Sequence, residues 1–568
     1  FSSDLLEYCV FLTMSFGAQF TPWGDTLQDK IGYTFPEGDS GVIQDSAQFE
    51  YRAPLPTYTA GQLLKIDLNT NGMGLDPATS YIKGTLKLRV VLSNGQAVGY
   101  NAVVPTLPGG IQDLFKDIRT RGFNGIDFEY NREYNQYHEV MRWIHVSPTQ
   151  ERENIAQMDL RGDCLTESEK MALMPWTRPT NAGAATFIDT VPTMSSNVSD
   201  AVGLPFIVKL DSAGFWNSKR YVPLRYQQSI SIEIQLEQAN RAFHCLVPLP
   251  GNLIDGTANI DPPSSGTAAT QYSVANIIYE LSDVSFFCNM VQFSPGMELA
   301  LKQTVEQQTG LPIFFNTYEV QKDVMSASSF TQRITKGVAN AVHAITILQL
   351  SSDLTDYTRD SFASEPFGLE YYRYRLGTKY FPDQPVRTKK RMLVEAERVF
   401  NFKGFNMAIP PSTITERIGA DRYDYGCGAA AITAASISMP LSGRYGGSGD
   451  SSAALTVNAP YGVPNTNVMA YLNAADAVPS RFYIAALLQA TPQDQLSGVA
   501  TNHGNQLQVE LNRYNTVAVP KTLATDTTNV KATSRACWGV QDTVQVTTFL
   551  VYTRVLLVEK DFNAAIRE

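Results

Sequence analysis

The feature that most constrains the fold of this chain is a set of short runs in which apolar and polar residues alternate. The clearest run is SISIEIQLE at 229–237, where the isoleucines and the leucine all point to one side of an extended strand. Such a strand has one buried and one solvated face, as in an antiparallel β-sandwich. The sequence therefore predicts an all-β fold, and similar runs, bounded by Gly, Pro, Asn and Asp, lie at 62–68, 81–92, 204–210, 311–320, 341–350, 369–376, 481–488, 507–514 and 545–559.

Helical patterns are few and short. An apolar stripe ended by Gly122 predicts a helix over 111–118, and two further stripes predict helices at 297–305 and 392–400. Three short helices cannot supply the repeated alternation of strand and helix that a parallel α/β barrel needs. The pattern therefore disfavours a chitinase-like barrel.

The length of 568 residues predicts more than one core. A stretch at 249–272 is rich in Pro, Gly, Ser and Thr and has no periodicity, so we interpret it as a linker or crossover between two β-rich halves of comparable size. The predicted organisation is an N-terminal arm at 1–39, a first sandwich at 40–248, this linker at 249–272, a second sandwich at 273–562 with an insertion at about 440–505, and a C-terminal tail at 563–568.

The content of charged residues indicates which class of macromolecule the surface of the protein binds. Charged residues make up only 18% of the chain and aromatic residues 11%, which favours a surface largely covered by protein partners. The formal net charge of −10 argues against a nucleic-acid coat, because phosphate binding requires clustered Lys and Arg. We therefore expect no direct sequence-specific binding of nucleic acid, and we interpret the basic run RTKKR at 387–391 as a solvated face or an interface edge.

The six cysteines are scattered singly, without a CxxC spacing, which predicts buried free thiols in a reducing compartment. No apolar run approaches the length of a membrane span, and the amino end carries Asp4 and Glu7 without a basic leader, so we expect no signal peptide there. Whether Asn197 is glycosylated, whether the tripeptide Arg161-Gly162-Asp163 binds a receptor and whether the amino end is processed are left open.

One stretch, GFNGIDFEYN at 122–131, carries a carboxylate pair. Asp127 and Glu129 would lie about 6.6 Å apart along a strand, a separation open to a glycosidase pair. However, the stretch lacks part of the DGxDxDxE pattern of chitinase-type hydrolases, and Asn124-Gly125 is a strong hairpin signal. We favour a hairpin in which Ile126, Phe128 and Tyr130 share one face, and a carbohydrate-active hydrolase using Asp127 and Glu129 is kept as the alternative.

The remaining motifs favour turns over sites. The calcium-loop-like segment 67–78 ends in Ala78 where a bidentate Glu is needed, and GCGAAA at 426–431 and GGSGDSS at 446–452 lack the context of nucleotide or phosphate loops. The five histidines have no metal-ligand spacing, and His343 is interpreted as a core histidine. We therefore predict no catalytic, cofactor-binding or metal-binding residue and no cofactor.

One segment carries a family resemblance. YYRYRLGTKYFPDQPV at 371–386, followed by the helical pattern at 392–400, resembles the YxxRxGxxxxPxQP segment of the double jelly-roll major capsid proteins of polinton-like viruses, virophages and related elements. Segments 109–137 and 222–239 are similar to parts of the amino-terminal jelly roll of that family. The residues that match in the first segment are Gly377, Pro382, Gln384 and Pro385.

This resemblance implies two jelly-roll β-sandwiches in tandem, a double jelly roll, with short helices and long loop insertions. It implies a structural protein and not an enzyme: a major capsid protein whose homotrimers form pseudo-hexameric capsomers in the icosahedral shell of a double-stranded DNA virus or virus-like element. The implied partners are further copies of the chain, penton and minor capsid proteins and, as an open question, an internal membrane. The implied location is the virion, assembled inside the host cell.

A third class of function stays open beside the capsid protein and the hydrolase. A secreted, lectin-like β-sandwich that binds a partner would also show this texture of strands. It would be a monomer or dimer with paired cysteines, whereas the capsid interpretation expects a trimer with free thiols. The host, the triangulation of the shell and the identity of the virus cannot be predicted from the sequence.

Overall fold

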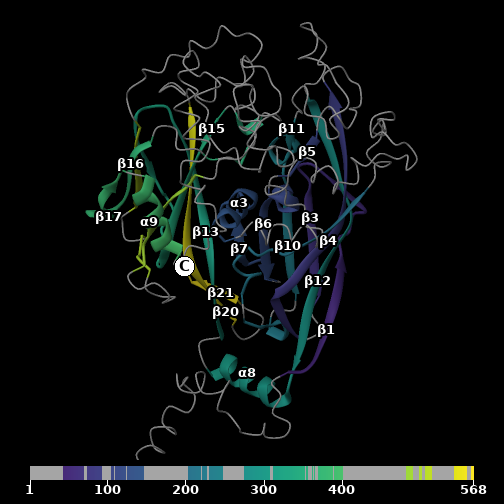
Figure 1. Ribbon diagram of the computed structural model, residues 1–568. Coiled ribbons are helices and arrows are strands. Elements are labelled where there is room, and N and C mark those ends of the chain that lie inside the picture. The colour runs from purple at the N-terminus through teal and green to yellow at the C-terminus, as the bar shows by residue number, and fades with distance from the viewer. Residues whose placement is uncertain are drawn as a thin grey trace, which may run out of the picture.

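Two antiparallel β-sandwiches stand side by side in the computed structural model, with their long strands upright in both (Figure 1). The first occupies the right of the view and the second the left. The structure describes residues 43–69, 73–92, 104–107, 109–122, 124–145, 203–218, 220–226, 229–246, 274–307, 311–351, 353–355, 361–362, 364, 369–387, 389–400, 482–489, 498–501, 506–513, 543–558 and 564–567.

The first sandwich has eight principal strands in two sheets. One sheet has the order β1-β12-β4-β8 and the other the order β3-β10-β6-β7, and all neighbours are antiparallel. The strands are β1 (Ile43–Arg52), β3 (Leu63–Asn69), β4 (Gly74–Leu92), β6 (Phe115–Gly122), β7 (Asp127–Asn131), β8 (Leu204–Val208), β10 (Ser229–Leu236) and β12 (Val274–Phe293).

The second sandwich repeats this arrangement. Its sheets have the orders β13-β20-β15-β18 and β14-β19-β16-β17, again antiparallel throughout. The strands are β13 (Leu311–Met325), β14 (Ser329–Arg333), β15 (Ala341–Leu350), β16 (Leu369–Leu376), β17 (Lys379–Val386), β18 (Ile484–Leu487), β19 (Leu507–Arg513) and β20 (Val544–Val558).

The two sandwiches are wound identically. When the eight strands of each are numbered in chain order, both give one sheet of order 1-8-3-6 and one of order 2-7-4-5. Two packed four-stranded sheets in which the chain crosses between sheets in this way form a jelly roll. The chain has a double jelly-roll fold, and the fold class predicted from the sequence is confirmed.

The boundary between the halves differs from the sequence prediction. β12 lies between β1 and β4 in the sheet of the first sandwich, so this sandwich ends at Phe293 and not at residue 248. The predicted linker at 249–272 lies outside the described residues, and it precedes β12 in the chain. The two sandwiches are joined through the segment that contains α8 (Pro295–Gln307). A shift in composition marks a loop, but it cannot tell which sheet the next strand will join.

Two further boundaries move for the same reason. β18 pairs with β15 inside the second sandwich, so the predicted insertion at about 440–505 ends before Ile484. The predicted tail at 563–568 contains β21 (Ala564–Arg567), which pairs with β20. The run at 481–488 was predicted as a strand, but its sequence does not show that it pairs with β15, whereas β21, with four residues, is too short to show a period.

The predicted helices at 297–305 and 392–400 are confirmed as α8 and α9 (Lys389–Phe400). The helix predicted over 111–118 is wrong, because Ile111 and Leu114 lie in the 3-10 helix η1 (Gly110–Leu114) whereas Phe115 and Ile118 lie in strand β6. Two consecutive elements produced the helical spacing. The other short elements are β2 (Thr57–Thr59), β5 (Val104–Thr106), α3 (Tyr134–His145), β9 (Val222–Pro223), η4 (Leu224–Tyr226), α6 (Ala239–Ala242), β11 (His244–Leu246) and η5 (Asp353–Thr355).

The predicted hairpin at Asn124-Gly125 joins β6 to β7. The Gly122 N–H donates to the Ile126 carbonyl at 2.9 Å and the Gly125 N–H to the Gly122 carbonyl at 3.0 Å. Three residues therefore separate the paired Gly122 and Ile126, one more than in a two-residue hairpin loop. Gly125 has φ of +79°, the left-handed conformation expected at the last position of such a three-residue loop.

Several sequence features lie outside the described residues. They are the N-terminal arm at 1–39, the tripeptide at 161–163, Asn197, the stretches at 426–431 and 446–452, and Cys9, Cys164, Cys427 and Cys537. Cys288 is described, and it is free and buried, as predicted for the thiols.

Candidate functional site

The candidate site is the junction between the two sandwiches, where α3 lies between strands of both (Figure 1). Helix α3 directly follows β7, and its residues face in two directions. Tyr134 is buried in the core of the first sandwich, whereas Tyr137, Val140 and Trp143 are buried in the core of the second. The helix therefore belongs to both hydrophobic cores.

Strand β13 forms the second sandwich's side of the junction, and its consecutive residues contact the first sandwich. Phe315 packs edge-on against Phe215 with ring centroids 5.9 Å apart and is buried in the first sandwich's core. Tyr318 stacks on Tyr137 at 3.9 Å. Further contacts from this strand are the Thr317 hydroxyl donating to Asn131 Oδ1 at 3.1 Å, and the ion pair of Glu319 with Arg132.

The backbones of the two sandwiches come into direct proximity at Gly214. A Cβ built on this glycine would lie 1.7 Å from the carbonyl oxygen of Asn316 in β13. No side chain fits there without moving the second sandwich. Glycine is thus required at this position by the close approach of another segment's backbone.

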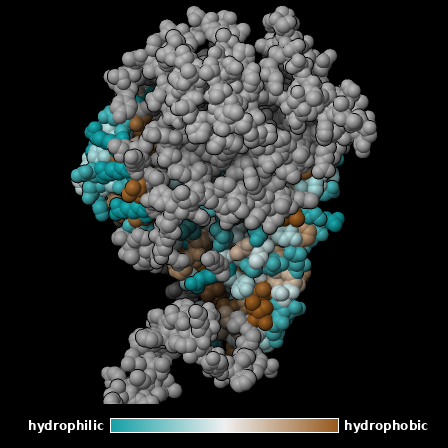
Figure 2. Space-filling view, in the orientation of Figure 1, coloured by the Kyte–Doolittle hydropathy of each residue, from teal (hydrophilic) through white to brown (hydrophobic). Residues whose placement is uncertain are grey.

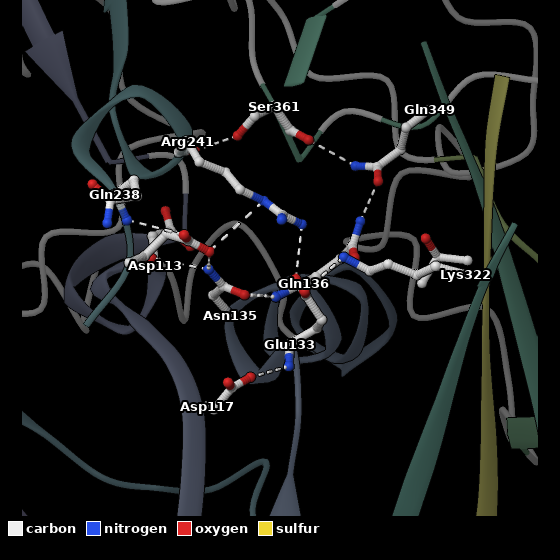
Figure 3. Close-up of polar contacts among 12 residues, drawn as sticks. Asp113, Asp117, Glu133, Asn135, Gln136, Gln238, Arg241, Lys322, Gln349 and Ser361 are labelled. Carbon is white, nitrogen blue, oxygen red and sulfur yellow. Dashed lines mark hydrogen bonds and ion pairs between the residues drawn. The ribbon is translucent and has the colours of Figure 1, made fainter. Parts of the chain in front are cut away.

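A charged cluster at the start of α3 crosses the junction (Figure 3). The Glu133 carboxylate lies 2.8 Å from Arg241 of the first sandwich and 2.7 Å from Lys322 of the second. Its backbone N–H donates to the Asp117 carboxylate at 2.9 Å, and its φ of +53° is a conformation that residues other than glycine rarely adopt. One carboxylate therefore joins cations from both halves.

The pKa shifts of this cluster follow from burial and from the charges. Burial alone would raise the pKa of Glu133, but Arg241 and Lys322 outweigh it and hold the pKa below its usual value. Burial and the nearby Arg241 lower the pKa of Lys322 to about 8. Burial raises the pKa of Asp117, although the Glu133 N–H opposes the shift. A pair with a residue from the opposite sandwich thus keeps Glu133 ionised.

Neutral polar side chains also form hydrogen bonds between the two sandwiches. The Gln136 amide of α3 donates to the side-chain oxygen of Gln349, and Gln349 Nε2 donates to the Ser361 carbonyl at 2.7 Å. The Ser361 hydroxyl donates to the Arg241 carbonyl, which returns the chain of hydrogen bonds to the first sandwich (Figure 3). A buried polar group stabilises the fold when its hydrogen-bond partners are in place and destabilises it when they are missing. This network therefore favours the one relative position of the two halves in which its hydrogen bonds form.

The interior of α3 carries a second ion pair. Arg142 and Glu139 pair with each other, and their side chains are 0% and 1% exposed. The Trp143 indole N–H donates to Glu139 Oε1 at 3.0 Å. A pair so buried stabilises the fold only while both partners are present.

The carboxylates of the hydrolase alternative occupy structural positions. Asp127 accepts from Arg119 at 2.7 and 2.6 Å and from Arg121 at 2.8 Å. Burial would raise the pKa of Asp127, but these hydrogen bonds lower it below its usual value. This carboxylate is paired, and it is a poor proton donor near neutral pH.

Glu129 is buried, as is Phe128, which was predicted to face the opposite side of the strand. Its carboxylate accepts from the backbone N–H groups of Gly214 at 2.8 Å and Phe215 at 2.9 Å, whereas Tyr130 is 42% exposed. Both faces of β7 are covered at these positions because β7 borders the junction. Burial raises the pKa of Glu129. These backbone contacts favour a structural role and do not favour the hydrolase alternative.

His343 is half-buried in β15, among mostly buried neighbours, and its ring lies 5.3 Å and 73° from that of Phe400. Burial and the neighbouring His145 lower its pKa to about 4. In the part of the chain that the structure describes, no group of three or more His, Cys, Asp or Glu side chains could hold a metal ion. Among those same residues, no helix is both long and apolar enough to cross a membrane.

His343 predicts an acid-sensitive fold. The unfolded chain binds a proton near pH 6.5 whereas the folded chain does not until about pH 4, so stability falls as pH falls through this interval. Between pH 7 and pH 4.5, the wild type should lose about 2 kcal/mol more than His343→Leu. Urea unfolding at both pH values measures the difference. Equal losses in the two proteins would contradict an imidazole that stays neutral in the folded protein.

Local sequence patterns do not mark the charged residues of this junction. Glu133, Arg241 and Lys322 are far apart in the chain, and each is an ordinary charged residue in its local context. The one available signal was the interruption of the strand pattern by a polar, Tyr- and Asn-rich segment at 131–137. That segment marks where β7 ends and α3 begins.

Comparison with known proteins gives matches at the level of structure. No family model matches the chain, and no curated protein matches its sequence. A chain from the cryo-EM structure of the Sputnik virophage is similar, with a TM-score of 0.47 and 10% identity, over 94% of this chain and 91% of that chain. The major capsid proteins of mavirus (TM-score 0.44, 8% identity, 95% and 95% covered) and Faustovirus (0.44, 9%, 98% and 97%) are also similar.

Proposed function

We propose that this chain is the major capsid protein of an icosahedral double-stranded DNA virus or virus-like element of the polinton-like or virophage type. In this proposal three copies form a pseudo-hexameric capsomer, and the capsomers tile the shell. The observation that carries the proposal is the identical winding of two jelly rolls that stand side by side in one chain.

The physical support comes from symmetry. Two similar sandwiches in one chain, repeated by a threefold axis, present six similar sides, and such blocks pack on a hexagonal lattice with a single gene product. The junction described above supports this role, because the apolar contacts of α3 and the Glu133 cluster hold the two sandwiches as one rigid unit. A building block of a lattice needs this fixed shape.

The low charge content supports extensive contacts with other proteins. We propose neighbouring capsomers, penton proteins and minor capsid proteins as further partners and the virion, assembled in the host cell, as the location. A structural role also accounts for Asp127 and Glu129, whose carboxylates are engaged by arginines and by backbone N–H groups. An internal membrane as a partner stays an open part of the proposal.

The mass of the purified chain in solution tests the trimer. Light scattering should give three times the chain mass of 62.6 kDa, and electron microscopy of the same sample should show particles with a hexagonal outline. A stable monomer or dimer at concentrations on the order of 10 µM would overturn the capsomer. Glycan hydrolysis that disappears in Glu129→Gln while the variant stays folded would instead favour the hydrolase.

A further inference from the structure

A cleft of about 570 Å³ lies between the start of α6 and the first residues of β12, and we call it the α6–β12 cleft. The end of β2 also lines it, and so does the 3-10 helix η5, which follows β15 of the second sandwich. Both sandwiches therefore contribute to its walls. Its volume lies within the range of small-molecule sites, which is about 300 to 1,000 Å³.

The cleft lies near one end of the upright strands. Strand β12 ends at Phe293, and only Ser294 separates it from α8, which lies at the foot of the molecule in Figure 1. β12 therefore begins at the opposite end of the molecule. Its lining residues, 276–279, are close to that beginning. The α6–β12 cleft is thus near the end of the sandwiches that is remote from α8.

The side chains that line the cleft are mostly polar, and none of them is charged at neutral pH. Three carry carboxamides and two carry hydroxyl groups: Gln238, Asn240, Asn276, Thr59 and Thr355. The hydroxyl of Tyr279, also in the lining, donates to the Glu237 carbonyl at 2.6 Å. The nearby charged side chains of Glu237 and Arg241 face the junction, where Arg241 pairs with Glu133. The lining therefore offers hydrogen bonds without a net charge.

Several of these polar groups are available to a ligand. Within the residues that the structure describes, the side chains of Thr59, Gln238, Asn240 and Thr355 make no hydrogen bond. Gln238 is exposed, and its side chain points away from Glu133 in Figure 3. A carboxamide and a hydroxyl can each donate and accept hydrogen bonds, which matches the hydroxyl groups of a ligand. Ile278, in the same lining, is 36% exposed and adds an apolar surface.

We propose that the α6–β12 cleft binds a neutral sugar, as one or two sugar units of a glycan. The sugar hydroxyl groups pair with the carboxamides of Gln238 and Asn240 and with the hydroxyl of Thr59. The C–H face of the sugar ring covers Ile278. Phosphate, sulfate and carboxylate groups are recognised chiefly by arginine and lysine, and neither residue lines the cleft. The chemistry of the lining therefore favours an uncharged sugar over an anionic ligand.

The position of the cleft is compatible with a shell. On the left flank in Figure 2, hydrophilic residues surround smaller hydrophobic patches, the mixture expected of a contact between proteins. In the proposed lattice the flanks of the upright sandwiches meet neighbouring copies, whereas the ends of the strands point to the two surfaces of the shell. A sugar can then reach the cleft without separating the copies. The site itself does not require the capsomer, and only its exposure on a shell rests on the proposed function.

Glycan binding by the purified full chain tests the site. An array of immobilised neutral, sialylated and sulfated glycans, probed with fluorescently labelled protein, should show binding to neutral glycans. Ligand-observed NMR with galactose, mannose and N-acetylglucosamine should then give a Kd on the order of 1 mM for at least one of them, because the contact consists of a few exposed hydrogen bonds. Binding to sialylated or sulfated glycans alone, or to no glycan, would overturn the proposal.

Matched variants locate the binding. The double variant Gln238→Ala and Asn240→Ala removes two carboxamides from the cleft and should raise the Kd about tenfold. It should remain folded, because Gln238 makes no side-chain cap hydrogen bond to α6 and alanine favours a helix. The control is Asn217→Ala, which removes an exposed carboxamide outside the cleft and should leave the Kd unchanged. Equal sugar binding by the wild type and the double variant would overturn the assignment to this cleft.

Light scattering of the same samples separates this proposal from the capsomer. The wild type and the double variant should form trimers to the same extent, and the trimer fraction should bind the sugar as the free chain does. A trimer that binds no neutral sugar would overturn the sugar site alone. A stable monomer that binds the sugar would overturn the capsomer alone.

Discussion

Replacing Gly214 with alanine should lower the free energy of unfolding by about 4 kcal/mol. The added methyl group would overlap the Asn316 carbonyl, at a distance of 1.7 Å, and a backbone oxygen of a paired strand cannot rotate away as a side chain can. The Glu129 carboxylate, at 3.2 Å from the same position, restricts movement on the other side. Thermal and urea unfolding of the purified protein measure the loss.

Gly296→Ala is the control for this substitution. Gly296 lies in α8, and a Cβ added there would meet no atom within 4 Å. Alanine also favours a helix over glycine by about 1 kcal/mol, so this variant should be as stable as the wild type or slightly more stable. Equal stability of the Gly214 and Gly296 variants would contradict the close approach of the two sandwiches at Gly214.

Glu139→Gln should cost about 3 to 5 kcal/mol, because it removes the negative charge that pairs with the buried Arg142 guanidinium. The glutamine fills nearly the same volume, so the effect reports the lost charge and not a cavity. Since α3 belongs to both cores, we expect the two sandwiches to lose stability together, in a single unfolding transition. Differential scanning calorimetry shows whether one transition or two are present.

Glu306→Gln on α8 provides the matching surface control. Glu306 pairs with Lys302 at 3.9 Å, and both side chains are largely exposed. Exposed pairs of this kind contribute about 0 to 1 kcal/mol, so the substitution should leave the unfolding temperature nearly unchanged. A comparable decrease of the unfolding temperature in both variants would show that burial does not make the Glu139–Arg142 pair more important for stability than an exposed pair.

The sequence predicted the individual strands better than their partners. The run at 229–237 predicted β10 because alternation is a local property, and its apolar residues Ile230, Ile232 and Ile234 are fully buried. The assignment of β12 to the first sandwich was missed, because pairing with β1 joins residues more than 200 positions apart. No local pattern encodes which sheet a strand enters.

The junction was the least predictable part. Glu129 lies on the face of β7 opposite Phe128, and its burial could not be predicted because the loop at Gly214 and the strand β13 cover it. The charges of Glu133, Arg241 and Lys322 meet only after both sandwiches have formed. A site built between two folded units depends on their relative position, and the sequence of each segment alone contains little information about it.

The position of β12 has a consequence for synthesis of the chain. β1 and β4 do not pair with each other, since β12 lies between them, so the first sheet stays open until residue 293 has left the ribosome. At about 5 to 20 residues per second, this leaves two long strand edges unpaired for on the order of tens of seconds. Unpaired edges of this length bind other strands readily. Nascent chains should therefore need chaperones during this interval. Without them, the exposed edges of neighbouring chains on one polysome should pair with each other, and less folded protein should be obtained.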